Sequence, residues 1–314
     1  MRPLDFAIAG TFVVVVIGAV LYATLVDGGR PDADLAISLS VLASDLEEPA
    51  RESAPSGLRF AVAAVLSPSA MLEEYEALEG YLEDRLARPV ELVRGKGYAE
   101  INALVRSRDV ALALVCSGAF VLGRRDFGMQ ALVVPVVNGA ATYRSYLIVG
   151  SSSDIATWDD LRGRAFAFTD PLSNSGRLVP VYMLVEMGES PEEFFDRFIF
   201  TYAHDRSINA VAVGLVDAAA VDSLVYDQMV LRDPLVASAT RVIWESPPYA
   251  INPIVVHPDA DPGLRRELEE LFLGMAEDPE GQVVLALLGI DSFAMPDPGG
   301  YETIEQMIEA TAGW

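Results

Sequence analysis

The sequence predicts an α/β protein of two lobes joined by two crossover segments and preceded by one N-terminal transmembrane helix. Three observations support this fold class. Short apolar runs alternate with amphipathic runs from residue 58 onward, which is the rhythm of parallel strands linked by helices. Two pairs of successive extended runs interrupt the alternation and divide it into two blocks. An uncharged apolar run of 21 residues, Phe6–Val26, lies near the start.

The run Phe6–Val26 is long enough to span a membrane, because 21 residues at about 1.5 Å each give a helix of about 31 Å. A cleavable signal peptide usually has a shorter apolar region, a basic start and a small-x-small exit. Here Arg2 is offset by Asp5, and the exit at 21–24 reads Leu-Tyr-Ala-Thr. We therefore expect residues 1–26 to be a retained inner-membrane anchor, with a removed signal segment as the alternative. In both cases the remainder would be periplasmic or otherwise extracytoplasmic.

Residues 27–56 are rich in Gly, Pro, Ser and acidic residues, which is typical of a linker. The first α/β block follows, with strands and helices expected in turn at Arg59–Leu66, Met71–Leu86, Val90–Val93, Ala99–Val105 and Val110–Val115. We expect lobe 1 to comprise residues 57–142 and 246–314, and lobe 2 to comprise residues 143–245.

The second block lies between the two extended pairs. The pairs are Gln130–Val137 with Thr142–Val149, and Arg241–Glu245 with Pro253–Val256. Thr157 and Asp160 form a capping box that predicts a helix start. Strands are expected at Phe166–Thr169, Phe198–Tyr202 and Ala218–Val221, and the last helices at Pro262–Ala276, Pro279–Leu288 and Gly299–Ala312.

The charge balance excludes polyanionic partners. The chain has 22 Lys and Arg against 46 Asp and Glu, a net charge of -24, and Lys96 is the only lysine. A field of this sign repels nucleic acid, so we expect no nucleic-acid partner. Any small anion must therefore be held by local donors.

The sequence shows no signature of catalysis, metal or cofactor. Cys116 is the only cysteine, and no His-Glu-x-x-His, Walker A or complete dinucleotide motif occurs. Ser175, His204 and Asp222 could be imagined as a hydrolase triad, but no Gly-x-Ser-x-Gly elbow is present. We expect a protein that is not an enzyme and that holds neither a metal nor a cofactor.

The segment from Asp170 to Gly176 is the strongest site candidate. It follows an apolar strand and precedes a helix-compatible run, so its hydroxyl and amide groups gather where helix N–H groups are unpaired and favour an anion. His204 and Asp222 follow two other expected strands. Because ligands bind beyond the carboxyl ends of strands in open α/β sheets, these groups predict an interlobe cleft, with Tyr98 on its other side. The alternatives are helix caps for Ser173 and Asp222, a capping or buried His204, and packing roles for the tyrosines.

From about Leu58 to Tyr301 the chain resembles the periplasmic phosphate-, phosphite- and phosphonate-binding proteins that feed ABC importers, which have the type II periplasmic-binding-protein fold. The resemblance is carried by Gly97–Glu100, Tyr143–Val149, Asp159–Gly163, Asp170–Gly176, His204–Asp205, Gly214–Asp217, Ser246–Pro247 and Asn252–Pro253. It implies that Tyr98 and Tyr143 line the cleft, that Ser173, Asn174 and Ser175 grip the anion, and that His204 donates from the side.

Two departures from the family pattern bear on the ligand. The family usually has Thr where this chain has Asn174, whose amide can still donate. Aminophosphonate binders place carboxylates, which pair with the ammonium, at the positions of Leu224 and Asn252. An amine-free ligand such as phosphite, phosphate or a simple alkylphosphonate is therefore favoured. Asp222 is the one nearby acid for an amine, and it could instead accept a proton from a monoprotonated ligand and so reject sulfate.

The resemblance implies a binding protein that captures a phosphorus oxyanion in the cleft and presents it to an ABC transporter permease. The alternative is a membrane-tethered sensor of the same fold that signals to a membrane protein. A phosphoester hydrolase is a third class, for which turnover is not expected.

Overall fold

The computed structural model describes residues 57–63 and 72–312. The predicted anchor at 6–26 and linker at 27–56 lie outside the described residues, as do the last three residues of the strand expected at Arg59–Leu66. Within the described ranges, none of the helices combines the length and the apolar character needed to cross a bilayer.

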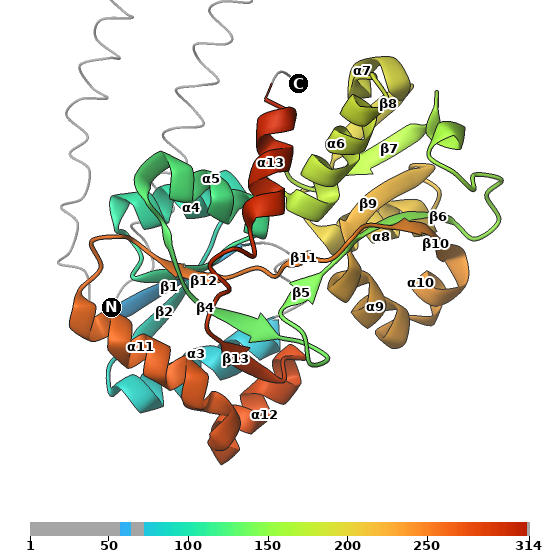
Figure 1. Ribbon diagram of the computed structural model, residues 1–314. Coiled ribbons are helices and arrows are strands. Elements are labelled where there is room, and N and C mark those ends of the chain that lie inside the picture. The colour runs from blue at the N-terminus through green and yellow to red at the C-terminus, as the bar shows by residue number, and fades with distance from the viewer. Residues whose placement is uncertain (1–56, 64–71, 313–314) are drawn as a thin grey trace, which may run out of the picture. The chain divides into compact units, whose positions relative to one another are not determined.

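The described chain builds two separate sheets, which confirms the two-lobed α/β fold (Figure 1). The first is six-stranded, in the order β13-β4-β12-β3-β1-β2. Its strands are β1 (Leu58–Val62), β2 (Val90–Arg94), β3 (Leu112–Leu114), β4 (Gln130–Val136), β12 (Ile254–Val256) and β13 (Ser292–Ala294). Its helices are α3 (Leu72–Leu86), α4 (Tyr98–Ser107), α5 (Ser117–Phe127), α11 (Pro262–Gly274), the 3₁₀ turn η3 (Met275–Glu277) and α12 (Pro279–Leu288).

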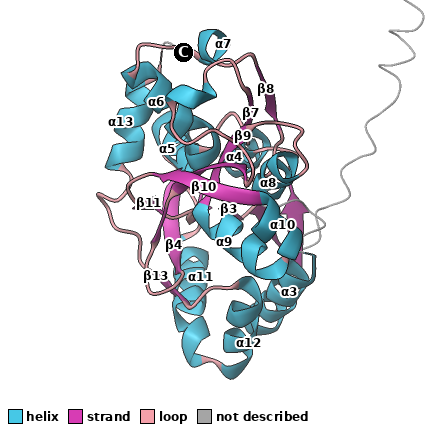
Figure 2. Ribbon diagram, turned by 90° about the vertical axis from the view of Figure 1, so that its right-hand side faces the viewer, coloured by secondary structure: helices cyan, strands magenta, loops and turns pink. Residues whose placement is uncertain are grey.

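The second sheet is five-stranded, in the order β10-β6-β9-β7-β8. Its strands are β6 (Ser145–Gly150), β7 (Ala165–Phe168), β8 (Arg197–Phe200), β9 (Ala218–Asp222) and β10 (Thr240–Glu245). Helical segments flank it on both faces (Figure 2). They are η1 (Asp159–Leu161), the π-helical turn η2 (Asn174–Leu178), α6 (Val179–Glu186), α7 (Pro191–Phe194), α8 (His204–Ala212), α9 (Ser223–Arg232) and α10 (Pro234–Ala239).

A short antiparallel ribbon connects the two sheets. It pairs β5 (Thr142–Tyr143) with β11 (Tyr249–Ala250), and Tyr143 lies opposite Tyr249. In Figure 1 the ribbon lies between the two sheets. Each strand of the ribbon is thus only two residues long. Most residues of the expected extended runs Thr142–Val149 and Arg241–Glu245 belong instead to β6 and β10 of the second sheet.

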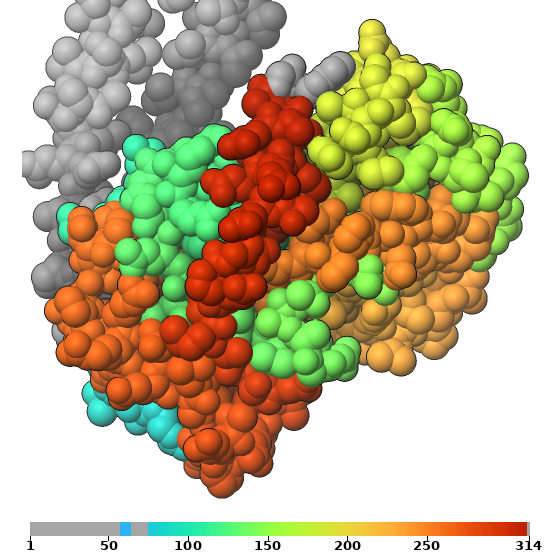
Figure 3. Space-filling view, in the orientation of Figure 1, coloured from blue at the N-terminus to red at the C-terminus, as the bar shows by residue number. Residues whose placement is uncertain are grey.

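The last helix, α13 (Glu302–Ala310), contacts both lobes. It packs against α5 of the first lobe and against η2 and α6 of the second. Figure 3 shows it in red along the junction between the green and the yellow surfaces. Its buried residues Ile304 and Met307 belong to a core cluster that also contains Tyr98, Phe120 and Tyr143.

Both sheets are mixed, whereas the alternation of runs predicted parallel sheets. In the first, β2 and β3 run parallel to β1, but β12 is antiparallel to β3 and β4. In the second, β7 runs parallel to β8 and β9, but β6 is antiparallel to β9 and β10. The strands β6 and β12 directly follow the two crossovers, and a chain that arrives from the other lobe enters the sheet from the opposite end. The strand β13 is also antiparallel to β4, although it follows α12 and not a crossover.

The predicted helix start at Thr157 is only a 3₁₀ turn. Asp160 accepts hydrogen bonds from the backbone and the hydroxyl of Thr157 at 2.9 Å each, which is only one half of the expected capping box, and Trp158 at the N-cap makes no side-chain capping bond. The turn η1 ends at Leu161, because Gly163 adopts a φ of +71° and leads directly into β7.

Candidate functional site

The segment after β7 forms the wall of a buried polar site. Ser173 caps the following turn, because its hydroxyl accepts the Gly176 N–H at 3.0 Å. The turn is wide, since the Leu178 N–H reaches the Ser173 carbonyl at 2.9 Å, five residues back. Single π turns inside helices are frequent at functional sites. The capping alternative for Ser173 therefore holds, and its hydroxyl hydrogen is still available to a ligand.

Gly176 permits this turn to lie directly on the strand. A Cβ there would come within 2.2 Å of the Thr169 hydroxyl oxygen. The Thr169 N–H also donates to the Gly176 carbonyl at 3.1 Å. Only glycine allows so close an approach of the turn to the end of β7.

The first lobe closes over this turn through three direct contacts. The backbone N–H of Tyr98, at the start of α4, donates to Asp170 Oδ2 at 3.1 Å. The Asn174 N–H points at the sulfur of Cys116 at 3.5 Å. Gly118, at the start of α5, approaches so closely that a Cβ there would lie 2.7 Å from the Leu172 carbonyl oxygen. The described chain is therefore in a closed arrangement around the turn.

Tyr143, from the ribbon, joins both lobes by hydrogen bonds. Its hydroxyl lies 2.7 Å from Ser117 Oγ and accepts the side-chain amide of Asn174 at 3.0 Å. The Ser117 N–H donates to Asn252 Oδ1 at 2.9 Å. Tyr143 and Asn252 thus belong to the framework of the site, where they position Ser117 and Asn174. Ser117 was not among the predicted site residues, although its position at a strand end was a signal for it.

Three buried polar atoms at this place lack any hydrogen-bond partner: Tyr98 Oη, Asn174 Oδ1 and Ser175 Oγ. Six such side-chain atoms occur in the described part of the chain, so half of them are gathered here. An unpaired buried polar group costs about 1–3 kcal/mol. A concentration of such groups indicates a site that a polar ligand completes.

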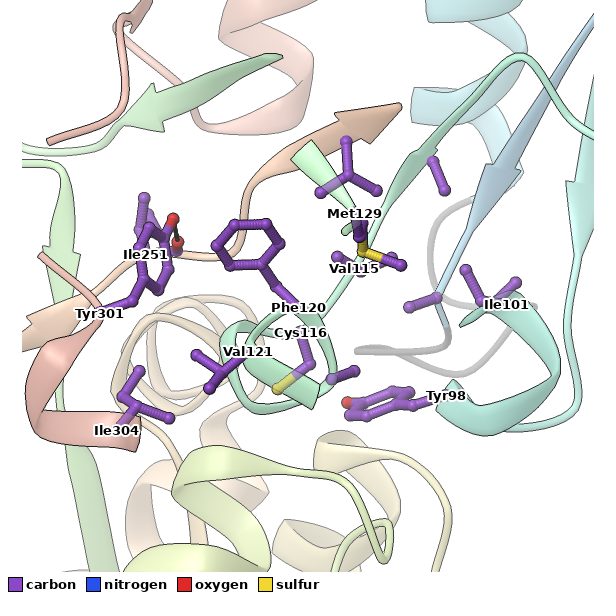
Figure 4. Close-up of a cluster of buried hydrophobic side chains, with 14 of the residues drawn as sticks. Tyr98, Ile101, Val115, Cys116, Phe120, Val121, Met129, Ile251, Tyr301 and Ile304 are labelled. Atoms are coloured by element: carbon purple, nitrogen blue, oxygen red, sulfur yellow. Dashed lines mark hydrogen bonds between the residues drawn. The ribbon is translucent and has the colours of Figure 1, made fainter. Parts of the chain in front are cut away.

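Tyr98 is 1% exposed and lies close to the other members of the site. Burial raises its pKa well above the usual value, and the nearby Cys116, Asp170 and Asp222 raise it further. Figure 4 shows the Tyr98 ring beside Cys116, with its hydroxyl end on the Cys116 side. A phenol with so high a pKa stays protonated and can donate to an anion.

Asn174 presents its carbonyl oxygen, because its amide nitrogen is used by Tyr143. The prediction was an amide donor toward the anion. A half-turn of the amide exchanges the two atoms, and the Tyr143 hydroxyl can donate as well as accept. Asn174 can therefore face either a bare oxygen or a protonated oxygen of a ligand.

His204 is held as a neutral ring at the start of α8. It is 1% exposed, and burial lowers its pKa to about 3. Its Nδ1 accepts the Asp222 N–H at 3.0 Å, so the proton of the neutral ring lies on Nε2. The hydrogen bond that we predicted from His204 to the anion would therefore be donated by Nε2–H.

Asp222 is both a helix cap and a buried acid. Its Oδ1 accepts the Leu224 N–H at 2.9 Å, as the capping alternative predicted. Burial raises the pKa of this carboxyl to about 7, despite the backbone N–H groups of Leu224 and Val225, which lower it. Near neutral pH the carboxyl can therefore carry a proton and donate it to a ligand oxygen.

Cys116 is chemically quiet. Burial raises the pKa of its thiol to about 11, so it carries no negative charge beside an anion and is no nucleophile at neutral pH. Within the described residues, moreover, no three His, Cys, Asp or Glu side chains are grouped as metal ligands.

The polar groups of the site are thus hydroxyl and amide groups, a neutral imidazole and the buried carboxyl of Asp222, and they converge from both lobes. One protein family, described as "ABC transporter, phosphonate, periplasmic substrate-binding protein", matches residues 60–301. The chain belongs to this family. It is a substrate-binding protein of the kind that serves ABC importers outside the cytoplasm, as the sequence predicted.

Curated relatives agree with this assignment. The phosphonates-binding periplasmic protein of Escherichia coli is 26% identical over 263 residues, which cover 82% of this chain and 78% of the relative. The phosphate-import protein PhnD of Mycolicibacterium smegmatis is 28% identical over 232 residues, covering 70% and 72%.

Solved structures share the fold of this substrate-binding protein. A binding protein component of an ABC phosphonate transporter from Pseudomonas aeruginosa superposes with a TM-score of 0.77 at 24% identity, covering 82% of this chain and 87% of that one. PhnD1 from Prochlorococcus marinus, in complex with methylphosphonate, has a TM-score of 0.74 at 20% identity, covering 83% and 100%.

Proposed function

We propose that the protein captures an amine-free phosphorus oxyanion, namely phosphate, phosphite or a simple phosphonate, for import by an ABC transporter. The observation that carries the proposal is the set of unpaired buried groups on Tyr98, Asn174 and Ser175 beside neutral His204. A tetrahedral oxyanion offers several acceptor oxygens, and neutral donors can satisfy these without a formal countercharge.

Leu224 and Asn252 support the restriction to amine-free ligands. Leu224 is apolar, and Asn252 uses its side-chain oxygen to accept the Ser117 N–H. Neither supplies a carboxylate for an ammonium group. Asp222 remains the only acid among the eight proposed site residues, and burial favours its neutral form. These eight are Tyr98, Tyr143, Ser173, Asn174, Ser175, His204, Asp222 and Asn252.

The protein acts by binding without turnover in this proposal. The lobes, which we place at residues 57–142 with 246–314 and at residues 143–245, close on the ligand about the ribbon of β5 and β11. The closed form is then presented to the permease, and residues 6–26 tether the protein at the outer face of the inner membrane.

Titration calorimetry of the full-length protein with phosphate, phosphite, methylphosphonate, 2-aminoethylphosphonate and sulfate tests the proposal. We expect micromolar or tighter binding of at least one amine-free phosphorus anion, and weaker binding of the aminophosphonate. Sulfate tests the role of Asp222, because a protonated carboxyl would accept sulfate and an ionised one would reject it. His204→Gln should weaken the binding, because it removes the Nε2–H donor. Preference for the aminophosphonate, or absence of heat with every phosphorus compound, would refute the proposal.

A further inference from the structure

An apolar cleft lies directly beside the proposed anion site. It has a volume of about 430 Å³ and is lined from both lobes, chiefly by Leu114, Val137, Leu224, Val225, Leu231 and Leu288. Asp222 and Asn252 also line it. Because Asp222 is linked to His204 and Asn252 is linked to Ser117, the cleft begins where the anion site ends.

The size and lining of the cleft exceed what an inorganic anion requires. Pockets that hold organic ligands typically measure about 300–1,000 Å³ and are mostly apolar, with a few polar groups that fix the orientation. Here Asp222 and Asn252 are the lining residues that are hydrogen-bonded to the anion site, and Asn138 and Gln228 are further polar residues of the lining. Leu231, on α9, is 86% exposed, so the outer end opens to solvent.

Charged side chains at the cleft do not favour a cationic substituent at its inner end. Leu224 supplies no charge beside Asp222, and burial raises the pKa of Asp222 toward its neutral form. Farther out, Asp227 and Arg232 both line the cleft, one of each sign. Burial also raises the pKa of Asp227.

We propose that this cleft receives an uncharged apolar substituent of a phosphonate whose head occupies the anion site. The inference rests on the proposed function and narrows its ligand class to alkyl- and arylphosphonates of several carbons. The tetrahedral head fixes the phosphorus beside Asp222, and the carbon chain extends between Leu224 of one lobe and Leu114 of the other. Apolar contact from both lobes also favours the closed arrangement.

The test is calorimetry of the full-length protein with phosphate and with methyl-, propyl-, butyl- and phenylphosphonate. The compound 2-aminoethylphosphonate serves as the comparison for propylphosphonate, because its substituent has the same length but carries a positive charge. We expect affinity to increase about fourfold for each methylene that the cleft buries. Propylphosphonate should bind at least tenfold more tightly than 2-aminoethylphosphonate.

Two variants separate the cleft from the anion site. Leu224→Ala should reduce the gain between methyl- and butylphosphonate at least threefold and leave phosphate binding unchanged. Leu235→Ala, an exposed leucine of the same lobe that does not line the cleft, is the matched control and should keep the full gain.

The outcomes distinguish the two proposals. Tight binding of phosphate or methylphosphonate with equal or weaker binding of the longer members would overturn the cleft inference alone. Preference for 2-aminoethylphosphonate over propylphosphonate would assign the cleft to a cation through Asp222 or Asp227 and would also overturn it. Absence of binding by every member would overturn the proposed function itself.

Discussion

Ser175 carries a hydroxyl into the interior where the described chain offers it no partner. The residue is 1% exposed, and its Oγ is unpaired, although its carbonyl oxygen accepts the Ser145 hydroxyl at 2.8 Å. A group of this kind makes the ligand-free protein less stable than it could be. In the proposed complex the Ser175 hydroxyl gains a hydrogen-bond partner, because the ligand accepts its hydrogen.

The first prediction follows from the difference between the unpaired Ser175 hydroxyl of the free protein and the paired hydroxyl of the complex. Ser175→Ala should weaken binding of the phosphorus anion about 10- to 100-fold, since a hydrogen bond to a charged group contributes about 1.5–3 kcal/mol. The same change should leave the free energy of unfolding of the ligand-free protein unchanged or increase it. Calorimetry and denaturant unfolding measure the two effects.

Ser145→Ala is the control for this experiment, because the Ser145 hydroxyl is also buried but has a partner. It should lower the free energy of unfolding by about 1 kcal/mol. If Ser175→Ala instead destabilised the free protein to the same degree and bound ligand normally, Ser175 would be a structural residue.

The second prediction is that ionisation of Asp222 makes binding of the phosphorus anion depend on pH. Burial places the pKa of Asp222 at about 7, and an anion can accept a hydrogen bond only from the protonated carboxyl. Above pH 7 the deprotonated fraction grows, so the dissociation constant should increase about tenfold for each further pH unit. Titrations between pH 5.5 and 9 measure this slope.

Asp222→Asn keeps a side-chain oxygen for the Leu224 N–H and removes the titrating group. In this variant only the ionisation of the ligand itself should remain in the pH profile. An unchanged slope above pH 7 would show that Asp222 does not contact the ligand in its protonated form.

The sequence predicted where the candidate site residues lie along the strands better than how they are bonded. It singled out Ser173, Asn174, Ser175 and His204 because polar residues after apolar runs mark strand ends. Which atoms are already engaged could not be predicted, since Tyr143 meets Asn174 only after the lobes are packed together. The role of Ser117 was missed for the same reason.

At the scale of elements, helix α5 begins against the turn Asp170–Gly176 of the other lobe. Gly118 makes this possible, because a Cβ there would lie 2.7 Å from the Leu172 carbonyl oxygen and 3.1 Å from the Asn174 nitrogen. Both neighbours are backbone atoms, so they cannot move aside as a flexible side chain would. The start of α5 therefore limits how closely the lobes approach.

Gly118→Ala should hinder closure and leave each lobe folded. We expect binding to weaken at least tenfold, with the melting temperature of the ligand-free protein unchanged or slightly higher, since alanine favours a helix over glycine. Gly80→Ala is the matched control, because Gly80 is also helical and a Cβ there meets nothing within 4 Å. Wild-type affinity in Gly118→Ala would contradict a closure that brings these atoms together.

Most elements were predictable from hydrophobic periodicity, and the exceptions have structural causes. Pro279–Leu288 is a helix over the predicted range, since Pro and Gly mark its two ends. The strand Ser292–Ala294 was missed, because three residues give no detectable alternation and its strand character comes only from pairing with β4. The two-residue ribbon likewise depends on partners more than 100 positions away.

At the scale of the whole molecule, the net charge of -24 opposes the capture of an anion. A field of this sign lowers the concentration of anions near the surface and slows their association. The neutral donors of the site act only within hydrogen-bond distance and cannot offset this long-range repulsion. Binding therefore combines an unfavourable approach with favourable contacts.

Salt should accordingly speed association. The Debye length is about 30 Å at 0.01 M ionic strength and about 8 Å at 0.15 M, so added salt screens the repulsion but not the buried contacts. We expect the association rate constant for the phosphorus anion to increase severalfold over this range, with the dissociation rate nearly constant. Stopped-flow measurements in sodium chloride, repeated in sodium fluoride, separate screening from competition by chloride. A rate that decreases with salt in both would mean that a local positive field steers the ligand to the cleft despite the overall charge.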